Sequence, residues 1–485
     1  MTLAAVALVA TLGLSAQKGM TPPAGGKAIS DELIGIFFED ISSAADGGLY
    51  AELIQNGSFE FNPTERDGWG AGTAWRMIRP GHSTGHIQPL STTPIHANNP
   101  NFMRLYIERV GHYYDFTGWT GFGIQNDGFD GISVKAGEKY DFSAFLRNIG
   151  DAKQVRIALV EPQQGWGKDP KLLAEAIIDV NTPGWKKYDA QLIPNATSEH
   201  AALQVLVLTI GEMDVDMVSL MPEDTYKGHG LRKDLAEALE ALHPKFMRFP
   251  GGCYVEGQEA PENAFRWERT VGPIEQRPGH YDANWRYWTT DGLGFHEFLQ
   301  LAEDLGAKPL YVVNVGIWHG GFTPVEELDG WIQECMDALE YANGPVTSKY
   351  GKMRAENGHS EPFNIEYLEI GNENANFHFD NNSDQSERYF ERYRKFYDAV
   401  KATYPNIKCI GNVESWGTDR PSWRSKEPVD MLDEHYYRNP SWFADAYHKY
   451  DNYDRKGPRI YVGEYAVTSQ YGKVGNMNAA LGEAV

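Results

Sequence analysis

Hydrophobic positions in the second half of the chain follow two alternating patterns. From about residue 227, short apolar runs rich in β-branched residues alternate with stretches in which apolar residues recur every three or four positions. This alternation is typical of repeated βα units around a parallel sheet. The expected strands are 245–251, 308–316, 365–373, 407–414, 430–437 and 459–467, and an earlier run at 33–42 reads as one more strand of this kind.

Helices are expected between most of these strands. One helical face is formed in 292–306 by Phe295, Phe298, Leu299, Ala302 and Leu305, and one in 386–403 by Tyr389, Tyr393, Phe396 and Val400. The pattern predicts an α/β fold, a (β/α)8 barrel of the TIM type, with 33–42 as its first strand, 365–373 as its fourth and 459–467 as its seventh. No eighth strand follows residue 467. The barrel is therefore expected either to lack its last strand, as in a fragment, or to be completed in a way that the pattern does not reveal.

Between residues 56 and 222 the period changes to two. Alternate apolar residues mark three strands: Tyr140, Phe142, Ala144 and Leu146; Val155, Ile157 and Leu159; and Leu203, Val205 and Val207. This pattern predicts an antiparallel β-sandwich inserted after the first barrel strand. Its ends, NGSFE (56–60) and MDVDMVSLMP (213–222), resemble those of jelly-roll carbohydrate-binding modules. We expect 27–55 to hold the first barrel strand, 56–222 the sandwich and 223–485 the rest of the barrel, which is incomplete.

Net charge and composition exclude some classes of function and leave others open. The formal net charge of the 485 residues is -23, which would repel nucleic-acid phosphates. Aromatic residues make up 13% of the chain, and their flat rings suit either the apolar faces of sugars or a large core. Three widely spaced cysteines form neither a disulfide framework nor a zinc site, so no metal and no cofactor are expected. Nothing in the composition indicates an oligomeric state.

The N-terminus carries a short apolar run at residues 4–16 that ends in small residues. It has the length of the apolar region of a signal peptide and is too short to span a membrane. A signal peptide at 1–17 and a secreted or periplasmic protein are expected. Against this, no Lys or Arg precedes Lys18.

Two glutamates stand at the ends of predicted barrel strands. Glu373 ends the run 365–373, and Glu464 lies near the end of 459–467. Because active sites of these barrels form at the C-terminal ends of the strands, and strands four and seven face each other, the two carboxylates could converge. Either could instead cap a helix or pair with an arginine. A facing pair of carboxylates, one an acid and one a nucleophile, is the usual equipment for glycoside hydrolysis.

Five segments of the chain together resemble those of one known family. The segments FFEDISSAADGGLYAELIQNGSFE (37–60), MRFPGGCYVEG (247–257), EPFNIEYLEIGNEN (361–374), DEHYY (433–437) and VGEYA (462–466) resemble glycoside hydrolase family 51 α-L-arabinofuranosidases in order and spacing. The resemblance covers about residues 30 to 470. It implies a retaining exo-acting enzyme that releases terminal arabinofuranosyl groups from arabinoxylan, arabinan or their oligosaccharides, with Glu373 as general acid/base and Glu464 as nucleophile.

Further site residues follow from the resemblance. Glu39 would bind arabinose hydroxyls, Arg248 would orient the acids, and Cys253 would line the sugar site. His435 and Tyr437 would border Glu464, with Tyr437 donating a hydrogen bond to it. Asn372 could bind a sugar hydroxyl, and Asn314 could reach one. The alternatives are a surface acid for Glu39, a structural ion pair for Arg248 and a small buried thiol for Cys253.

Two other functions remain open. One is another retaining glycosidase of the same clan, such as a β-xylosidase or endoglucanase, against which the segments FFED and RFPGGC argue. The second is a carbohydrate-binding protein with an inactive barrel, suggested by the sandwich and the missing last strand. The presence of both Glu373 and Glu464 argues against this second function.

Overall fold

The computed structural model describes residues 30–111, 118–162, 169–376, 386–414 and 426–467; the expected signal peptide at 1–17 lies outside these residues. Seven parallel strands pair in the order in which they follow one another along the chain. They are β1 (Ile36–Phe37), β13 (Phe246–Phe249), β16 (Lys308–Val313), β19 (Tyr367–Ile370), β20 (Lys408–Glu414), β21 (Met431–Arg438) and β22 (Arg459–Val467). All seven expected barrel strands are therefore confirmed, and the sheet is a nearly closed barrel of the TIM type.

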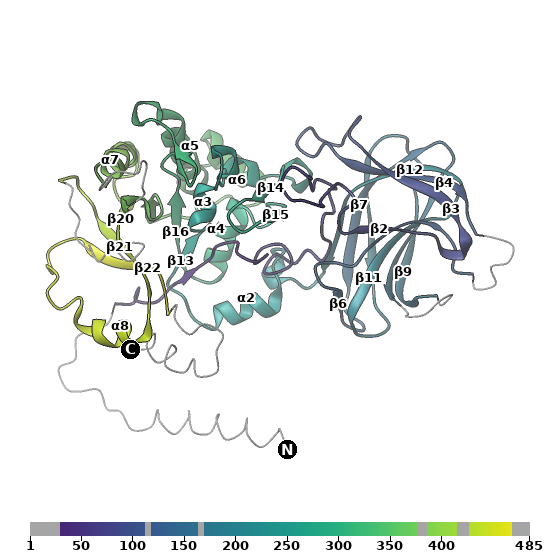
Figure 1. Ribbon diagram of the computed structural model, residues 1–485, viewed down its shortest axis with the longest axis horizontal. Helices are drawn as coiled ribbons and strands as arrows, with labels where there is room; N and C mark the ends of the chain where they lie inside the picture. Colours follow the sequence, from purple (N-terminus) through teal and green to yellow (C-terminus); the bar gives the residue numbers. More distant parts are fainter. Residues whose placement is uncertain (1–29, 112–117, 163–168, 377–385, 415–425, 468–485) are drawn as a thin grey trace, which may run out of the picture. The chain divides into compact units, whose positions relative to one another are not determined.

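Helices follow most of the strands and cover the outside of the sheet (Figure 1). They are α2 (Lys233–Glu240), α3 (Cys253–Glu256), α4 (Phe295–Asp304), α5 (Asp329–Asn343), α6 (Lys349–Glu356), α7 (Ser386–Thr403) and α8 (Pro440–Asp445). The two expected helices are confirmed as α4 and α7. Their predicted apolar faces are buried in one core that also contains Phe249 and Ile370 from the strands. Among the described residues, no helix is both long and apolar enough to cross a membrane.

The barrel interior contains a second, smaller core. Leu310, Val312, Tyr367, Ile410 and Tyr461 pack there, with Phe246 and Met431 partly buried against them. These residues point inward from β13, β16, β19, β20, β21 and β22. The interior is therefore filled by side chains, as in other barrels of this type.

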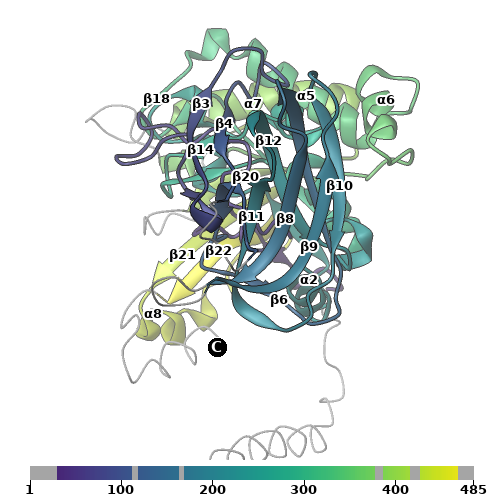
Figure 2. The same ribbon diagram turned by 90° about the vertical axis from the view of Figure 1, so that its right-hand side faces the viewer.

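The chain between β1 and β13 forms two antiparallel sheets, although β1 and β13 are themselves neighbours in the barrel. The first has the order β10 (Lys186–Leu192), β7 (Tyr140–Ile149), β12 (Gly211–Pro222), β4 (Phe102–Arg109), β3 (Thr84–Leu90). The second has the order β2 (Trp75–Ile78), β5 (Phe122–Asn126), β11 (Ser198–Val207), β8 (Gln154–Glu161), β9 (Lys171–Asp179), with β6 (Ile132–Val134) paired to β11. Figure 2 shows edge strands β9 and β10, from different sheets, side by side.

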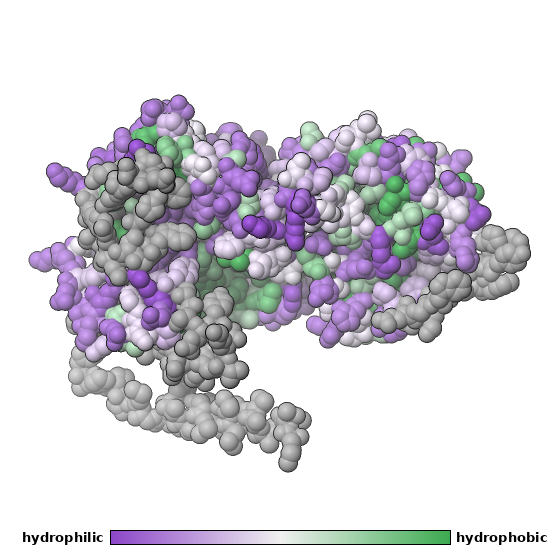
Figure 3. Space-filling model, viewed as in Figure 1, coloured by the Kyte–Doolittle hydropathy of each residue, from purple (hydrophilic) through white to green (hydrophobic). Residues whose placement is uncertain are grey.

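One core lies between these two sheets. The alternate apolar residues expected on three strands are all buried in it, from Tyr140 to Leu146, from Val155 to Leu159 and from Leu203 to Val207. The period-two interpretation of these strands is confirmed, because the alternate residues of each strand pack inward on one face. On the other face of β8 and β11, Ala158, Val160 and Ala202 form a small apolar cluster of their own. On the face seen in Figure 3, polar residues cover most of the surface and hydrophobic residues form small groups.

Glu52 joins the segment after β1 to strand β12. Its carboxylate accepts hydrogen bonds from the hydroxyl of Ser219 at 2.5 Å and from the backbone amides of Leu220 and Ile54, both at 2.9 Å. Burial raises the pKa of Glu52 to about 7, although these hydrogen bonds oppose the rise. The folded protein therefore binds more protons at this residue than the unfolded chain does between its ordinary pKa and about pH 7.

This proton balance predicts the effect of Glu52→Gln. Since Glu52 binds its proton more tightly in the folded state, it lowers stability progressively as the pH rises from about 4.5 to 7. The amide keeps an acceptor for the backbone and never ionises. We expect the variant to match the wild type near pH 4 and to exceed it at pH 8 by roughly 1–3 kcal/mol in unfolding free energy. Thermal unfolding at both pH values measures this, with Glu199→Gln, an exposed carboxylate in β11, as the control that should show no such difference.

Two further antiparallel hairpins lie among the described residues. They are β14 (His280–Asp282) with β15 (Tyr287–Thr289), and β17 (Ile317–Trp318) with β18 (Gly321–Phe322). The turn of the β14–β15 hairpin reaches the barrel mouth, where Trp285 contacts Glu39.

Candidate active site

A polar layer lies above the apolar interior of the barrel. Side chains two residues apart on a strand share a face, so Arg248 follows Phe246 inward, Glu369 follows Tyr367, and Asp433 follows Met431. All three polar residues are at most 1% exposed. Each of these strands therefore changes from an apolar to an ionic interior within two residues.

Arg248 is the centre of this layer. Its guanidinium holds Glu369 through two hydrogen bonds of 2.7 and 3.0 Å, Glu464 Oε1 through one of 2.8 Å, and the side-chain oxygen of Asn372 at 2.8 Å. Such a fixed fork orients carboxylates more rigidly than a lysine could. Glu464 is thus held in place from below by a fully buried positive charge.

A β-bulge points Glu464 toward the barrel interior. Asp433 pairs with Tyr461 and His435 with Glu464, so one residue of β21 lies opposite two residues of β22. If the same residues formed a regular strand without a bulge, alternation from the buried Tyr461 would turn Tyr465 inward and Glu464 outward. Instead Tyr465 is 57% exposed and the Glu464 side chain only 9% exposed.

Gly463 makes this bulge sterically feasible. A Cβ at this position would lie 2.6 Å from Asp433 Oδ1 and 2.9 Å from His435 Nε2. The backbone amide of Gly463 instead donates a hydrogen bond of 2.8 Å to Asp433.

Glu373 reaches the same place by leaving its strand. Strand β19 ends at Ile370, and both Gly371 and Glu373 have positive φ angles, of 84° and 51°. A left-handed conformation in a non-glycine residue is uncommon and is often found at functional sites. Glu373 Oε1 lies 2.9 Å from His435 Nδ1. One carboxylate oxygen each of Glu373 and Glu464 and one ring nitrogen of His435 all lie within 4.8 Å of one another.

His435 connects the two glutamates to Asp433. Its Nε2 lies 2.7 Å from Asp433 Oδ2, and its Nδ1 lies 3.8 Å from Glu464 Oε2. Burial alone would lower the pKa of His435, but the charges of Asp433 and Glu464 raise it well above its ordinary value. The imidazolium and Arg248 in turn outweigh the effect of burial on Glu464 and lower its pKa. Glu464 therefore stays ionised in weak acid.

Tyr437 and Glu39 complete the ring around Glu464. The hydroxyl of Tyr437 donates a hydrogen bond of 2.5 Å to Glu464 Oε2. Glu39 accepts one of 2.8 Å from the amide of Tyr254 and one of 3.3 Å from the indole of Trp285, at the turn of the β14–β15 hairpin. Burial, with the charge of Glu464, raises the pKa of Glu39 to about 7. Glu39 can thus be protonated or ionised near neutral pH.

The remaining expected residues lie at the barrel mouth in different roles. Asn372 contacts both Arg248 and, at 3.3 Å, Glu256, so its amide orients neighbouring side chains. Cys253 is half-buried at the start of α3, and burial with the charges of Glu256 and Glu39 raises the pKa of its thiol. The amide of Asn314 binds the backbone of Val255, Gly316 and Ile317 and so serves the local turn.

Several residues of this site were not predicted from the sequence. They are Glu369, Asp433, Gly252, Glu256 and Trp285. Alternation could have identified Glu369, because it stands four residues before Glu373 inside an apolar run. No sequence pattern indicated a role for Gly252. In the structure, a Cβ at this position would lie 2.7 Å from Glu464 Oε1 and 3.4 Å from Glu39 Oε2. Its missing side chain leaves space between the two carboxylates.

Three groups of side chains among the described residues bring three metal-ligand atoms within 4.8 Å. Each includes residues of this site: Cys253, Glu256 and His319; Glu369, Asp433 and His435; and Glu373, His435 and Glu464. In the second and third groups, Arg248 and the imidazolium of His435 already balance the carboxylates. The arrangement offers an acid, a carboxylate nucleophile and hydroxyl-binding groups around one small space.

Comparisons with known proteins agree with this chemistry. A model of the α-L-arabinofuranosidase 1 domain matches residues 238–455. α-L-arabinofuranosidase 1 of Arabidopsis thaliana is 37% identical over 479 residues, which are 98% of this chain and 66% of the relative. An extracellular exo-α-L-arabinofuranosidase of Streptomyces chartreusis is 36% identical, over 95% of this chain and 54% of the relative.

A solved structure decides the family. The arabinose-bound structure of a family 51 α-L-arabinofuranosidase superposes with a TM-score of 0.79 at 30% identity, covering 92% of this chain and 68% of that one. The chain belongs to glycoside hydrolase family 51. It spans 66% and 54% of the length of the two curated family 51 relatives named above.

Proposed function

We propose that this family 51 chain is a retaining, exo-acting α-L-arabinofuranosidase that releases terminal non-reducing arabinofuranosyl residues from arabinoxylan, arabinan and arabino-oligosaccharides. The proximity of Glu373 and Glu464 carries the proposal. One oxygen of Glu373 and one of Glu464 lie within 4.8 Å of each other. This proximity favours the roughly 5–5.5 Å between the carboxyl groups of retaining glycosidases over the about 6.5–9.5 Å of inverting ones.

In the first step, Glu464 attacks the anomeric carbon while Glu373 gives its proton to the departing glycosidic oxygen. The C–O bond to the leaving group breaks as the bond to Glu464 forms, which yields a covalent arabinosyl-enzyme with inverted configuration. In the second step, Glu373 takes a proton from water, and the hydroxyl oxygen displaces Glu464. Two inversions retain the α configuration, and Glu373 regains its proton. No net proton is consumed.

The surrounding residues support these roles. Arg248 and Tyr437 hold the two oxygens of Glu464, and with the imidazolium of His435 they keep it ionised. Glu39, backed by Trp285 and Tyr254, faces the space beside Gly252, where it could bind sugar hydroxyls. Cys253 and Asn372 are proposed to line the same space. We further propose that the antiparallel sheets of 56–222 are a jelly-roll, carbohydrate-binding-module-like insert, and that the protein is secreted or periplasmic, like the relative named extracellular.

The proposal predicts a specific outcome with 4-nitrophenyl glycosides. We expect turnover of the α-L-arabinofuranoside, with α-arabinose as the first product in a proton NMR time course, and at most weak turnover of the β-D-xyloside. In Glu373→Gln, hydrolysis of substrates with a sugar leaving group should fall by about 10²- to 10⁴-fold, because general acid help is lost. Formation of the arabinosyl-enzyme from the 2,4-dinitrophenyl glycoside should change little, because that leaving group needs no proton.

Other outcomes separate the alternatives. Preference for the xyloside would assign the chain to another retaining activity. A first product of β configuration would exclude the double displacement. A folded chain that binds arabinose but turns over none of these substrates would be a carbohydrate-binding protein.

A methyl group at Gly252 tests the space between the carboxylates. The φ angle of Gly252 is -97° and its ψ angle is -104°, which lies between the α and β regions, so alanine would bring some backbone strain. Its Cβ would also press on Glu464 Oε1. We expect Gly252→Ala to lower kcat/KM by about 10²-fold, the order expected for a misplacement of about 1 Å. The control is Gly330→Ala in α5, where a Cβ would meet no atom within 4 Å. Equal activity of both variants would show that this space is not used.

A further inference from the structure

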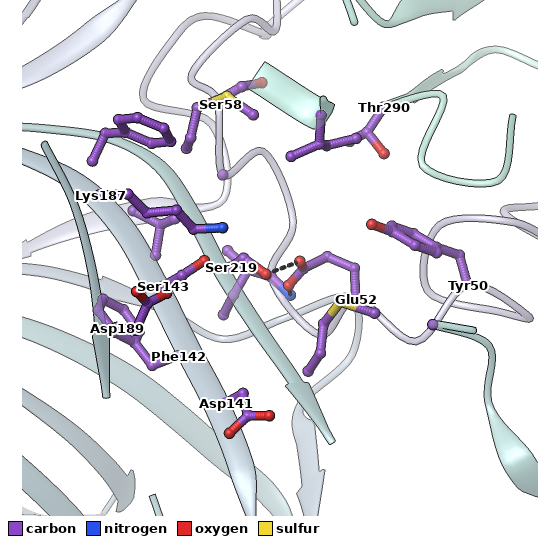
Figure 4. A pocket seen from close by; sticks show the side chains of 18 of the residues that line it. Tyr50, Glu52, Ser58, Asp141, Phe142, Ser143, Lys187, Asp189, Ser219 and Thr290 are labelled. Carbon is purple, nitrogen blue, oxygen red and sulfur yellow. Dashed lines mark hydrogen bonds between the residues drawn. The ribbon is translucent and has the colours of Figure 1, made fainter. Parts of the chain in front are cut away.

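A cavity separate from the carboxylate site lies against the outer face of the five-stranded antiparallel sheet. Its volume is about 730 Å³. One wall consists of outward-facing residues of β7, β10 and β12, and the other consists of the segment 50–58, residues 274–279 and the end of the β14–β15 hairpin. Figure 4 shows Lys187, Ser143 and Asp189 on one side of it and Tyr50 and Thr290 on the other. No residue of this cavity has a part in the proposed hydrolysis.

The lining suits a neutral ligand with many hydroxyl groups. Hydroxyls, carboxylates and an ammonium group line the cavity together with four aromatic residues, Tyr50, Phe142, Phe145 and Trp288. A sugar hydroxyl both donates and accepts hydrogen bonds, and a sugar face packs on a ring, so a sugar can contact both the polar and the aromatic lining residues.

Charge argues against an anionic ligand. Four carboxylates line the cavity, on Glu52, Asp141, Asp189 and Glu223, against the cations of Lys187 and Arg277. Arg277 is already bound to Glu297 at 2.7 Å and to the carbonyl of Asp291 at 2.7 Å. A phosphate or carboxylate would therefore meet a net negative surface.

Hydrogen bonds within the protein hold both walls of the cavity in place before any ligand binds. The hydrogen bonds of Glu52 to Ser219, Leu220 and Ile54 fix the segment 50–58 on β12, and Figure 4 shows the bond to Ser219 across the cavity floor. On the other wall, the amide and hydroxyl of Thr290 both donate hydrogen bonds to Asp46, at 2.6 and 2.9 Å. Binding would thus require little reordering of the walls, which favours affinity.

The β14–β15 hairpin links this cavity to the carboxylate site. Trp288 lines the cavity, while Trp285, three residues earlier in the same hairpin, donates its hydrogen bond to Glu39. Three residues span at most about 11 Å. A saccharide chain held against Trp288 is therefore close to the residues that surround Glu464.

We propose that this cavity is a second binding site, for a neutral oligosaccharide, that holds part of a substrate chain near the carboxylate site. The binding itself stands independently, whereas its use during hydrolysis rests on the proposed function. The second site should promote hydrolysis of polymeric substrates and not of a small aryl glycoside, because the latter fills only the sugar pocket between the glutamates.

The experiment is a calorimetric titration of the full chain with α-1,5-linked arabinotriose and with xylotriose, without and with saturating arabinose. Arabinose should occupy the sugar pocket alone, so we expect at least one trisaccharide to keep binding in its presence. Ser143→Trp, which fills the cavity from β7, should weaken this binding at least tenfold. It should leave hydrolysis of 4-nitrophenyl α-L-arabinofuranoside within twofold of the wild type.

Two further variants keep the test decisive. Lys187→Ala with Asp189→Ala removes two exposed polar side chains without adding bulk and should also weaken the binding. Gln88→Trp places the same indole on exposed β3, at the opposite edge of the same sheet, and should change nothing. Loss of all trisaccharide binding in arabinose, or equal effects of Ser143→Trp and Gln88→Trp, would overturn the proposal. Second-site binding without hydrolysis would overturn only the proposed function, and hydrolysis without second-site binding only this inference.

Discussion

Glu464→Gln should abolish turnover, with kcat on 4-nitrophenyl α-L-arabinofuranoside reduced by about 10⁴- to 10⁶-fold, the range seen when a nucleophile is removed. The amide is nearly the same size as the carboxylate and can keep contacts with Arg248 and Tyr437. It cannot form the covalent intermediate. The measurement is a steady-state rate with variant protein whose circular dichroism spectrum matches the wild type.

Two comparisons distinguish loss of the nucleophile from loss of the fold. Glu366→Gln changes an exposed carboxylate just before β19, bound to Lys308, and should retain full activity. In Glu464→Gly, azide can enter the vacated space and displace the leaving group once, so we expect restored cleavage with β-L-arabinofuranosyl azide as product. An azide of α configuration would mean that another residue is the nucleophile.

Arg248→Met should cause the largest loss of stability of any single substitution in the site. The guanidinium is fully buried and balances Glu369 and Glu464, so its removal leaves two buried carboxylates without their partner. Breaking a buried ion pair in this way costs about 3–5 kcal/mol. The orphaned carboxylates should take up protons more readily in the folded state, so the loss should be larger at pH 8 than at pH 5. Denaturant unfolding at both pH values measures it.

A second buried arginine serves as the matched control. Arg354 is also 0% exposed, but its guanidinium binds only backbone carbonyls, such as those of Tyr341 and Gly344. Arg354→Met should also destabilise the protein, with little dependence on pH between 5 and 8, and the folded fraction should keep its kcat. If Arg248→Met shows the same pH dependence as Arg354→Met, the balance of charge described for the barrel interior is wrong.

The barrel could be predicted from the sequence because its strands are buried on both faces. Continuous apolar runs such as 308–316 and 365–373 differ plainly from the amphipathic helices between them. The antiparallel strands were visible for a different reason, since their core-facing apolar residues recur at every second position. Hairpin β14–β15 was not predicted: its strands are three residues each, too short for either period to show.

The site could be predicted only where the sequence places an acid at a strand end. Glu373 and Glu464 were predicted in this way. Glu369 and Asp433 lie within strands, and their roles become clear only from their contacts with Arg248 and His435, respectively. Contacts between distant segments, such as Trp285 with Glu39, leave no trace in local pattern. The sugar-binding roles expected for Asn372 and Asn314 stay predictions. In the structure their amides contact protein groups, as buried amides must.

The extra residue in β22 has a consequence for how this barrel can change over evolutionary time. Before the bulge, Tyr461 packs in the apolar interior of the barrel, and after it Glu464 faces the proposed active site. The bulge shifts the alternation of inward and outward side chains by one position between these two parts of the strand. Substitutions that alter the part after the bulge need not disturb the packing before it, whereas a change that let the same residues pair without a bulge would exchange the inward and outward positions of every residue after Gly463. The orientation of Glu464 therefore depends on local strand pairing as much as on residue identity.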